Sequence, residues 1–489
     1  MSESIKELQP KEVWSYFSEL CAIPRGSKKE EKVIAYMKAF GESLGLETIV
    51  EDIGNVIIKK DATPGMENRK VTVLQGHIDM VHQKNSDVSF DFDKDGIKTQ
   101  IVDGWVTAEG TTLGADNGIG VSSAMAILAS KDIPHPPLEA LFTIDEETGM
   151  TGAINLSPDN LTGKVLLNLD SEEDDELTIG CAGGVNTTAN MKYPEDKLKG
   201  KYTGYELTVK GLKGGHSGID IHLGRGNANK ILNRFLYNAE KGTKMRLASI
   251  DGGGLRNAIP REAKATFAIP KKKIKKFAKK FNERRAEILD EYKHIEPEML
   301  IELREVKTPK KVMSEGTQNR LTGAVAAIFN GVYRMTPDIP GLVETSSNLA
   351  RVLAKKGKLA IQSLQRSSIE SGKLDVVNTI KAALNPLGAN ISNDSDYPGW
   401  PPATDSDILK VMQQTYENLF GEQPKVSACH AGLECGIIGK QYPEMDMISF
   451  GPEIRNPHSP DEKINIESVG KFWTLLLEVL KNIPEDLES

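Results

Sequence analysis

The first third of the chain alternates between helical and strand-like hydrophobic patterns. Apolar residues recur at helical spacing through KVIAYMKAFGESLG. Ser27 and Glu30 predict a capping box ahead of this helix, and Gly45 can end it. From 71 to about 171, short β-rich runs alternate with helical runs such as GIGVSSAMAILAS. This alternation predicts a mixed or parallel sheet with helices on both faces.

The pattern changes near Gly183. From there to about Asn385 it predicts the order strand, helix, strand, strand, helix, and then the same order again. YELTVKG begins the first pass and LIELREV begins the second. We therefore expect a degenerate internal duplication, which places Asn257 and Asn348 at roughly corresponding positions.

Alternation of helix and strand patterns returns at about Ile391, and the final run, ESVGKFWTLLLEVLKNI, has the apolar stripe of an amphipathic helix. A chain of 489 residues is too long for one core. We predict an α/β protein whose main domain is formed by residues 1–183 and 387–489. The inserted segment, 184–386, would be an α+β lid domain, which the duplication would make a doubled ferredoxin-like unit.

Composition limits the classes of partner. The formal net charge of −8 argues against general nucleic-acid binding. The basic run from Pro270, PKKKIKKFAKKFNERR, is better explained as the solvated face of a helix that turns Phe277 and Phe281 inward. No run approaches the ~18 apolar residues of a membrane span, and the first residues lack the pattern of a signal peptide. We expect a cytoplasmic protein without nucleic-acid or membrane partners.

Five acidic and histidine residues lie on separate motifs, most of which follow a predicted strand. The motifs VTVLQGHIDM, TTLGADNGIG, LFTIDEETG, LLNLDSEED and ISFGPEIRNPHSPDE contain His77, Asp116, Glu147, Asp170 and His458. One such residue alone is usually a loop residue or a helix cap. Five that can converge where strands end predict a metal site. Mixed histidine and carboxylate ligands suit zinc, manganese or cobalt, and Glu146 remains as the general base that a metal hydrolase needs.

The motifs GHIDMV, LGADNG, DEETG, NLDSE and PHSPDE resemble those of the di-zinc aminopeptidase, aminoacylase and dipeptidase superfamily. ETSSNLA, CHAGLECG and the length of the inserted segment make the chain similar, within it, to the aminoacyl-histidine (Xaa-His, or β-alanyl-histidine) dipeptidases. The resemblance extends over nearly the whole chain. It implies two divalent ions, with zinc as the first choice and cobalt or manganese as alternatives.

The resemblance also implies how the ligands are shared. Asp116 would bridge both ions, with His77 and Asp170 on one ion, and Glu147 and His458 on the other. Glu146 would take a proton from the attacking water and pass it to the leaving amine. Asp79 would accept the second N–H of the His77 imidazole. A cis peptide bond would follow Asp116.

Four further residues resemble the substrate-facing positions of this family. His216, in LKGGHSG, would steady the oxyanion, and Asn257, in RNAIP, would contact the substrate backbone. Arg366, in SLQRSS, would hold a free carboxylate, and Gly432, in CHAGLECG, would let its loop pass close to the substrate. The alternatives are an exposed loop histidine, a turn asparagine, a solvated arginine at a strand end and an ordinary turn glycine.

We predict a metal-dependent dipeptidase that acts on small dipeptides with a free amine and a free carboxylate. One alternative is an N-acyl-amino-acid amidohydrolase or desuccinylase, although such relatives usually carry a lid about half as long. Another is a catalytically silent metal-binding protein, which would be expected to lack Glu146 or a ligand. Whether the chain is a monomer or a homodimer stays open.

Overall fold

The computed structural model describes residues 4–337 and 339–487, and the chain divides into two compact units. The first unit comprises Met1–Gly180, Pro402–Ala428 and Leu433–Ser489; the second comprises Cys181–Pro401 and Cys429–Gly432. The expected lid range, 184–386, falls inside the second unit, which reaches further along the chain because strand β19 (Asn390–Tyr397) pairs with β9 (Gly183–Lys192). Within the described residues, none of the helices has the length and apolar character needed to cross a membrane.

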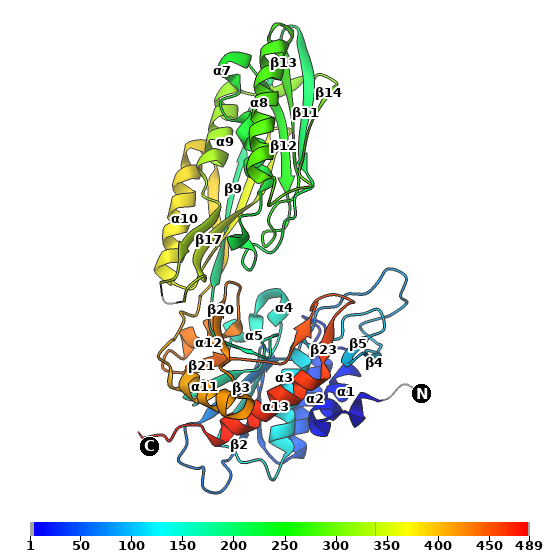
Figure 1. Ribbon diagram of the computed structural model, residues 1–489, viewed down its shortest axis with the longest axis vertical. Coiled ribbons are helices and arrows are strands. Elements are labelled where there is room, and N and C mark those ends of the chain that lie inside the picture. The colour runs from blue at the N-terminus through cyan, green and yellow to red at the C-terminus, as the bar shows by residue number, and fades with distance from the viewer. Residues whose placement is uncertain (1–3, 338, 488–489) are drawn as a thin grey trace. The chain divides into compact units, whose positions relative to one another are not determined.

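The first unit is built on an eight-stranded mixed sheet (Figure 1). Its strands, in spatial order, are β1 (Glu47–Val50), β2 (Val56–Lys60), β6 (Leu138–Thr143), β3 (Thr72–His77), β7 (Val165–Asn168), β21 (Asp446–Ser449), β8 (Glu176–Cys181) and β20 (Lys425–Cys429). The central strands β6, β3, β7 and β21 are parallel to one another. Because both faces of these strands are covered, every residue of β3, β6 and β7 is buried.

Helices and a smaller sheet complete this unit. The helices are α1 (Lys11–Cys21), α2 (Glu31–Ser43), α3 (Ala115–Ala129), α4 (Glu146–Gly149), α5 (Thr151–Ile154), α11 (Asp407–Phe420), α12 (Glu434–Gln441) and α13 (Ile466–Lys481). The smaller sheet has the order β22 (Ile454–Arg455), β23 (Lys463–Asn465), β5 (Trp105–Ala108) and β4 (Thr99–Val102). Helix α3 packs on β3 and α1, whereas α11 packs on β21 and α13. Val469 of the final helix lies in one apolar cluster with Val106 of β5 and Ile119 of α3, so this helix belongs to the core of the first unit.

The second unit contains two βαββαβ modules in one antiparallel sheet. The first module runs β11 (Tyr202–Lys210), α6 (Ala228–Leu236), β12 (Arg246–Gly253), β13 (Ala263–Pro270), α8 (Ile274–Tyr292) and β14 (Leu300–Val306). The second runs β9, α9 (Glu315–Ala327), β17 (Val343–Lys355), β18 (Lys358–Ser367), α10 (Glu370–Leu384) and β19. The spatial order is β14-β11-β13-β12-β17-β18-β9-β19. In each half the fourth and first strands are neighbours, followed by the third and second, which is the ferredoxin-like order.

The duplication is real, but its predicted boundary is wrong. LIELREV is β14, which closes the first module by pairing with β11. The first strand of the second module is β9, which precedes the whole first module in the chain and pairs with β18 and β19. Asn348 lies inside β17, whereas Asn257 lies in the loop after β12. The Asn348 side chain donates to the carbonyls of Arg256 and Ala258, so it holds that loop.

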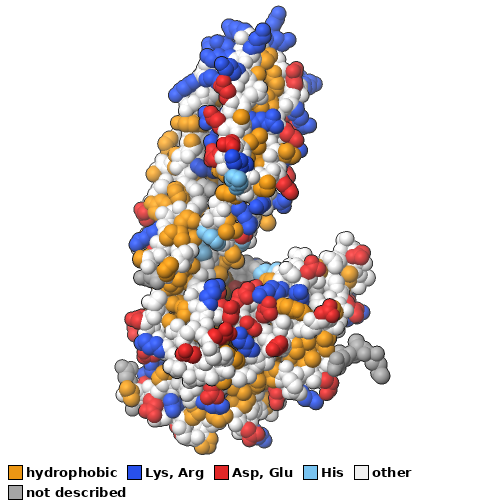
Figure 2. Space-filling view, in the orientation of Figure 1, with side chains coloured by type: hydrophobic (Ala, Val, Ile, Leu, Met, Phe, Trp, Pro, Cys, Tyr) orange, Lys and Arg blue, Asp and Glu red, His pale blue; other side chains and the backbone are white. Residues whose placement is uncertain are grey.

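One apolar core joins the sheet of the second unit to its helices, and Phe277 and Phe281 of α8 contribute to it. Both side chains are 7% exposed, so the basic run is the outer face of a packed helix, as the pattern predicts. Figure 2 shows Lys and Arg side chains gathered at the end of this unit nearest α7 (Glu240–Thr243). The remaining strands are β10 (Glu195–Lys197), β15 (Lys311–Met313) and β16 (Gly331–Met335).

Candidate metal centre

The five predicted ligands come together at one edge of the first unit's sheet. His77 is the last residue of β3, Asp170 follows β7 by two residues, and Glu147 lies in α4 just after β6. Parallel strands end at the same edge, which brings these side chains together. Asp116 is presented by the first turn of α3, and His458 by the loop between β22 and β23.

The five side chains form two groups that share Asp116. Oδ1 of Asp116 lies 3.0 Å from Nε2 of His77, which is also 3.5 Å from Oδ1 of Asp170. Oδ2 of Asp116 lies 3.1 Å from Nε2 of His458, which is also 2.9 Å from Oε2 of Glu147. In each group the potential ligand atoms all lie within 4.8 Å of one another. The two oxygens of one carboxylate thus serve two adjacent sets of donors, which suits a pair of cations.

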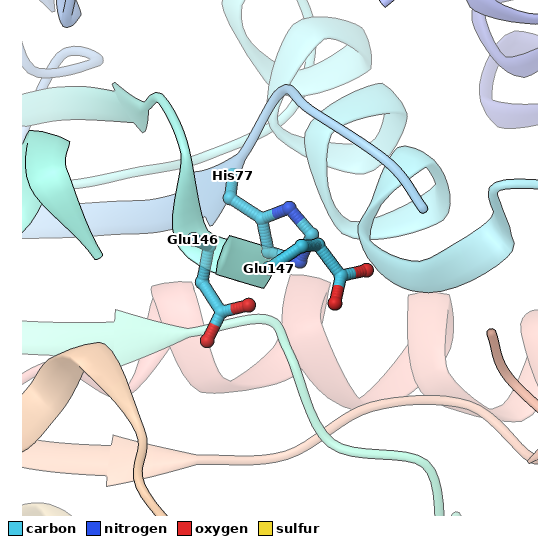
Figure 3. Close-up of side chains that lie close together, drawn as sticks. All are labelled: His77, Glu146 and Glu147. Carbon is cyan, nitrogen blue, oxygen red and sulfur yellow. The ribbon is translucent and has the colours of Figure 1, made fainter. Parts of the chain in front are cut away.

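Glu146 lies beside both groups without belonging to either. One of its oxygens is within 4.8 Å of donor atoms of His77 and Glu147. Figure 3 shows that the carboxylates of Glu146 and Glu147 leave α4 in different directions near the His77 ring. The residue before them, Asp145, has φ 52°, in the left-handed region, and its carboxylate accepts from the hydroxyls of Thr148 and Thr151. These bonds hold the unusual backbone that presents the two glutamates.

Asp79 is fully buried behind His77. Its Oδ1 lies 3.3 Å from Nδ1 of His77, and its oxygens accept the backbone N–H groups of Glu146 (3.1 Å) and Glu147 (3.3 Å). The Ser27 hydroxyl also donates to it, over 2.7 Å. The predicted capping box is therefore wrong, because Ser27 serves Asp79 and α2 begins without a side-chain cap. The peptide bond after Asp116 is cis, as the resemblance implied.

Two buried carboxylates that the sequence analysis did not single out support the segments that carry the predicted ligands. Glu462 accepts the backbone N–H groups of Leu113 (2.8 Å), Gly114 (3.0 Å) and Ala115 (2.8 Å), which fixes the turn that carries Asp116. Glu434, at the start of α12, accepts from Gln75 and Thr143, each over 2.6 Å, beneath the ends of β3 and β6. Both lie within motifs quoted for the family resemblance, PHSPDE and CHAGLECG, so an acidic residue inside such a motif was the available signal.

The charge balance of the cluster favours cations. Burial raises the pKa of Asp170 to about 7. The nearby His77 opposes this rise, whereas the Asp116 and Glu147 carboxylates add to it. Burial also holds the pKa of Glu146 well above its usual range. The hydrogen bonds that the protonated His458 ring donates to the Asp116 and Glu147 carboxylates raise the pKa of His458 to about 11. Several carboxylates crowd into one desolvated place, and bound divalent ions would relieve their mutual repulsion.

The substrate-facing residues expected from the inserted segment lie in the second unit. His216 and Asn257 are adjacent there, because the N–H of Ser217 donates to the Asn257 carbonyl over 2.7 Å. Arg366, on β18, is 5% exposed, and one of its terminal nitrogens lies 3.4 Å from Nε2 of His216. Gly432 lies in the short Cys429–Gly432 segment of this unit and is partly exposed. His216, Asn257 and Arg366 therefore form one cluster, and the role expected of Gly432 stays a prediction.

Comparison with known proteins agrees with this architecture. The chain matches Peptidase family M20/M25/M40 over residues 73–482. It is 43% identical to the cytosol non-specific dipeptidase of Escherichia coli over 484 residues, covering 99% of this chain and 100% of that protein. The crystal structure of aminoacylhistidine dipeptidase from Vibrio alginolyticus has a TM-score of 0.93, at 45% identity, covering 99% of both chains. Aminopeptidase PepT from Bacillus cereus shares the fold, with a TM-score of 0.56 and 17% identity, covering 97% of this chain and 99% of that one.

The family match spans most of the chain, and the relative from Escherichia coli is aligned along its full length. Together these matches show that the protein belongs to peptidase family M20/M25/M40 and is a peptide hydrolase.

Proposed function

We propose that the protein is a metal-dependent dipeptidase that hydrolyses unsubstituted dipeptides, including those of the Xaa-His type and β-alanyl-histidine. The observation that carries the proposal is the pair of ligand groups that share Asp116, with Glu146 beside them. The names of the two full-length relatives, a non-specific dipeptidase and an aminoacylhistidine dipeptidase, support the substrate class. The relative from Escherichia coli is named as cytosolic, which supports a cytoplasmic location here.

The residues present fit two divalent cations. His77, Asp116 and Asp170 would hold one ion, and Asp116, Glu147 and His458 the other. Imidazole nitrogens mixed with carboxylate oxygens suit zinc first, with cobalt or manganese as alternatives. Oε1 of Glu147 is buried and makes no hydrogen bond among the described residues, so it is free to coordinate. When bound, two such ions polarise the peptide carbonyl and lower the pKa of the attacking water.

The chain's own residues would then move the proton and hold the substrate. Glu146 would accept the proton of the attacking water on its carboxylate and deliver it to the leaving amine. Its raised pKa, caused first by burial, suits a group that must hold a proton between the two steps. His216 would donate to the developing oxyanion, Asn257 would contact the substrate backbone, and Gly432 would let its loop pass the substrate. Arg366 would bind the free carboxylate, for which a guanidinium is well shaped.

Two other functions are less well supported. An N-acyl-amino-acid amidohydrolase would share the ligands, but the second unit here contains two modules rather than one. A catalytically silent metal-binding protein would not need Glu146, which lies beside both groups with no ligand position of its own.

A substrate panel on metal-reconstituted protein tests the proposal. Free dipeptides such as β-alanyl-histidine are compared with acetyl- and succinyl-amino acids, with chelator and with zinc, cobalt or manganese added back. We expect turnover of the free dipeptides, loss with chelator and recovery with metal. Preferential cleavage of the acylated amino acids would favour the amidohydrolase. Full activity in protein that elemental analysis finds free of metal would overturn the metal mechanism.

A further inference from the structure

Four residues of the second unit stand in one row across its sheet. The register pairs Ser346 of β17 with Arg366 of β18, Arg366 with Gly184 of β9, and Gly184 with Tyr397 of β19. Directly paired residues of antiparallel strands point to the same face. Gly184 has no side chain, so Arg366 and Tyr397 can meet above it. Nη1 of Arg366 donates to the Tyr397 hydroxyl over 3.0 Å.

The hydrogen bond between Arg366 and Tyr397 requires a glycine at position 184. A Cβ atom at this position would lie 2.7 Å from the ring and hydroxyl of Tyr397. Any larger residue would therefore displace the tyrosine. The gap in the row is what lets the hydroxyl reach the guanidinium.

The Arg366 guanidinium is buried without an acidic partner. Its side chain is 5% exposed, and among the described residues its terminal nitrogens contact the Tyr397 hydroxyl and the His216 ring rather than a carboxylate. Its Nε is also buried and makes no hydrogen bond within the described chain. A buried charge of this kind is costly unless an anion pairs with it. The partner that this site lacks is therefore an anion brought by a ligand.

His216 provides independent evidence for the same anion. Its Nδ1 accepts the backbone N–H groups of Gly218 (3.3 Å) and Ile219 (3.1 Å). An imidazole whose Nδ1 accepts must carry its proton on Nε2. That Nε2–H faces a terminal N–H group of Arg366 over 3.4 Å. Two donors turned toward each other indicate an acceptor that both can reach.

The Tyr397 hydroxyl is a third donor in this place. Because its oxygen accepts from Arg366, its own hydrogen must point elsewhere. Tyr397 is partly exposed, unlike Arg366, so this hydrogen can reach a ligand. We infer that Tyr397 is a specificity-determining residue that donates a hydrogen bond to the same free carboxylate of the substrate that Arg366 binds. The inference rests on the proposed dipeptidase function for the identity of the anion.

Replacing Tyr397 with Phe keeps the ring and removes the donor. For a free dipeptide we expect kcat/KM to fall about 10- to 100-fold, mainly through KM, since a hydrogen bond to a charged group is lost. For the matching dipeptide amide, which has no carboxylate, we expect little change. Tyr333→Phe is the matched control, because that hydroxyl contacts Asp375 in the same unit and is outside the row. Equal losses on dipeptide and amide, or no loss on either, would overturn the inference.

A second comparison separates direct contact from support of Arg366. In an Arg366→Ala background, a tyrosine that touches the carboxylate still contributes, so Tyr397→Phe should lower kcat/KM further. No further loss would show that Tyr397 acts only by positioning Arg366. Gly184→Ala should reproduce the Tyr397→Phe selectivity, because its Cβ atom would displace the tyrosine.

Binding measurements keep this test independent of turnover. Calorimetry with free histidine and with histidinamide compares the same two ligands without catalysis. We expect wild type to prefer the free acid and Tyr397→Phe to lose most of that preference. If wild type cleaves no dipeptide yet shows this preference, the proposed function fails while the anion site stands. If it cleaves dipeptides and Tyr397→Phe keeps the full preference, only the inference about Tyr397 fails.

Discussion

Oδ1 of Asp79 lies 3.3 Å from Nδ1 of His77, the ring nitrogen opposite the one that faces Asp116. A carboxylate in this position fixes the tautomer of a ligand histidine and raises its basicity. The same carboxylate holds the backbone N–H groups of Glu146 and Glu147. One buried side chain therefore orients the predicted ligand His77 at the end of β3 and the two glutamates that follow β6.

We predict that Asp79→Asn lowers metal affinity or activity about 10- to 100-fold, the usual effect of losing a partner behind a ligand. The amide would present an N–H group where the carboxylate accepted one. Metal affinity, measured by competition with a chelator, and turnover check this result. Ser27→Ala, which removes only one donor to Asp79, should have a much smaller effect. Equal effects of the two variants would contradict the role assigned to Asp79.

Glu146→Gln should keep two equivalents of metal and reduce turnover by about 10²–10⁴-fold, because the amide preserves shape but cannot accept the proton. Elemental analysis and steady-state kinetics on the same preparation check both parts. Glu147→Gln is the matched control from the next position and should lose metal. Near-normal turnover of Glu146→Gln would assign the base to another group. Loss of metal from it would show that the two glutamates exchange roles.

Glu462→Gln should destabilise the turn that carries Asp116. The carboxylate accepts from four backbone N–H groups, and an amide would turn a donor toward at least one of them. We expect a loss of about 1–3 kcal/mol in the free energy of unfolding, together with weaker metal binding. Chemical denaturation and metal titration measure the two effects. Asp461→Asn, at the exposed neighbouring position, should change neither.

The convergence of the five predicted ligands could be expected because most of them follow a local signal: a strand that ends in a histidine or acid, or a Gly-rich turn. That they bind metal stays a prediction. The peptide-hydrolase class followed from the same motifs and is supported by the family match. The fold class was also correct, since alternating patterns reflect which faces of each element are buried.

What the sequence could not give is pairing between distant segments. The hydrophobic pattern gives only the order of elements along the chain, and in that order LIELREV looks like the start of a repeat. Tertiary packing decides which strand it pairs with, and that strand is β11. Ser27 and Glu30 satisfy a local rule for helix capping, but the Ser27 hydroxyl instead donates to Asp79, 52 positions later. The row that joins Arg366 to Tyr397 has no sequence signature, because it depends on the register of three strands.

His216 should remain neutral well below neutral pH. Burial, with Arg366 adding to it, lowers the pKa of this imidazole to about 4. In the unfolded chain the pKa of a histidine is ~6.5. As pH falls from about 6.5 towards 4, the unfolded chain therefore binds this proton before the folded chain does. Protonation of His216 thus lowers the stability of the second unit over this pH range. NMR titration of the ring should show the low pKa in wild type and a higher one in Arg366→Gln. A wild-type pKa near the unfolded value would contradict the packing described for this cluster.

His216→Ala and Arg366→Ala should fail in different ways. A developing oxyanion exists only near the transition state, so His216→Ala should lower kcat more than it raises KM. A free carboxylate is present in the bound substrate throughout, so Arg366→Ala should mainly raise KM for free dipeptides. Dipeptide amides have no carboxylate to hold, and the arginine variant should cleave them almost as well as wild type does. Steady-state kinetics on each dipeptide and its amide therefore separate the two residues. If Arg366→Ala lost equal activity on both substrates, the guanidinium would not bind the carboxylate, and its burial without an acidic partner would need another anion to explain it.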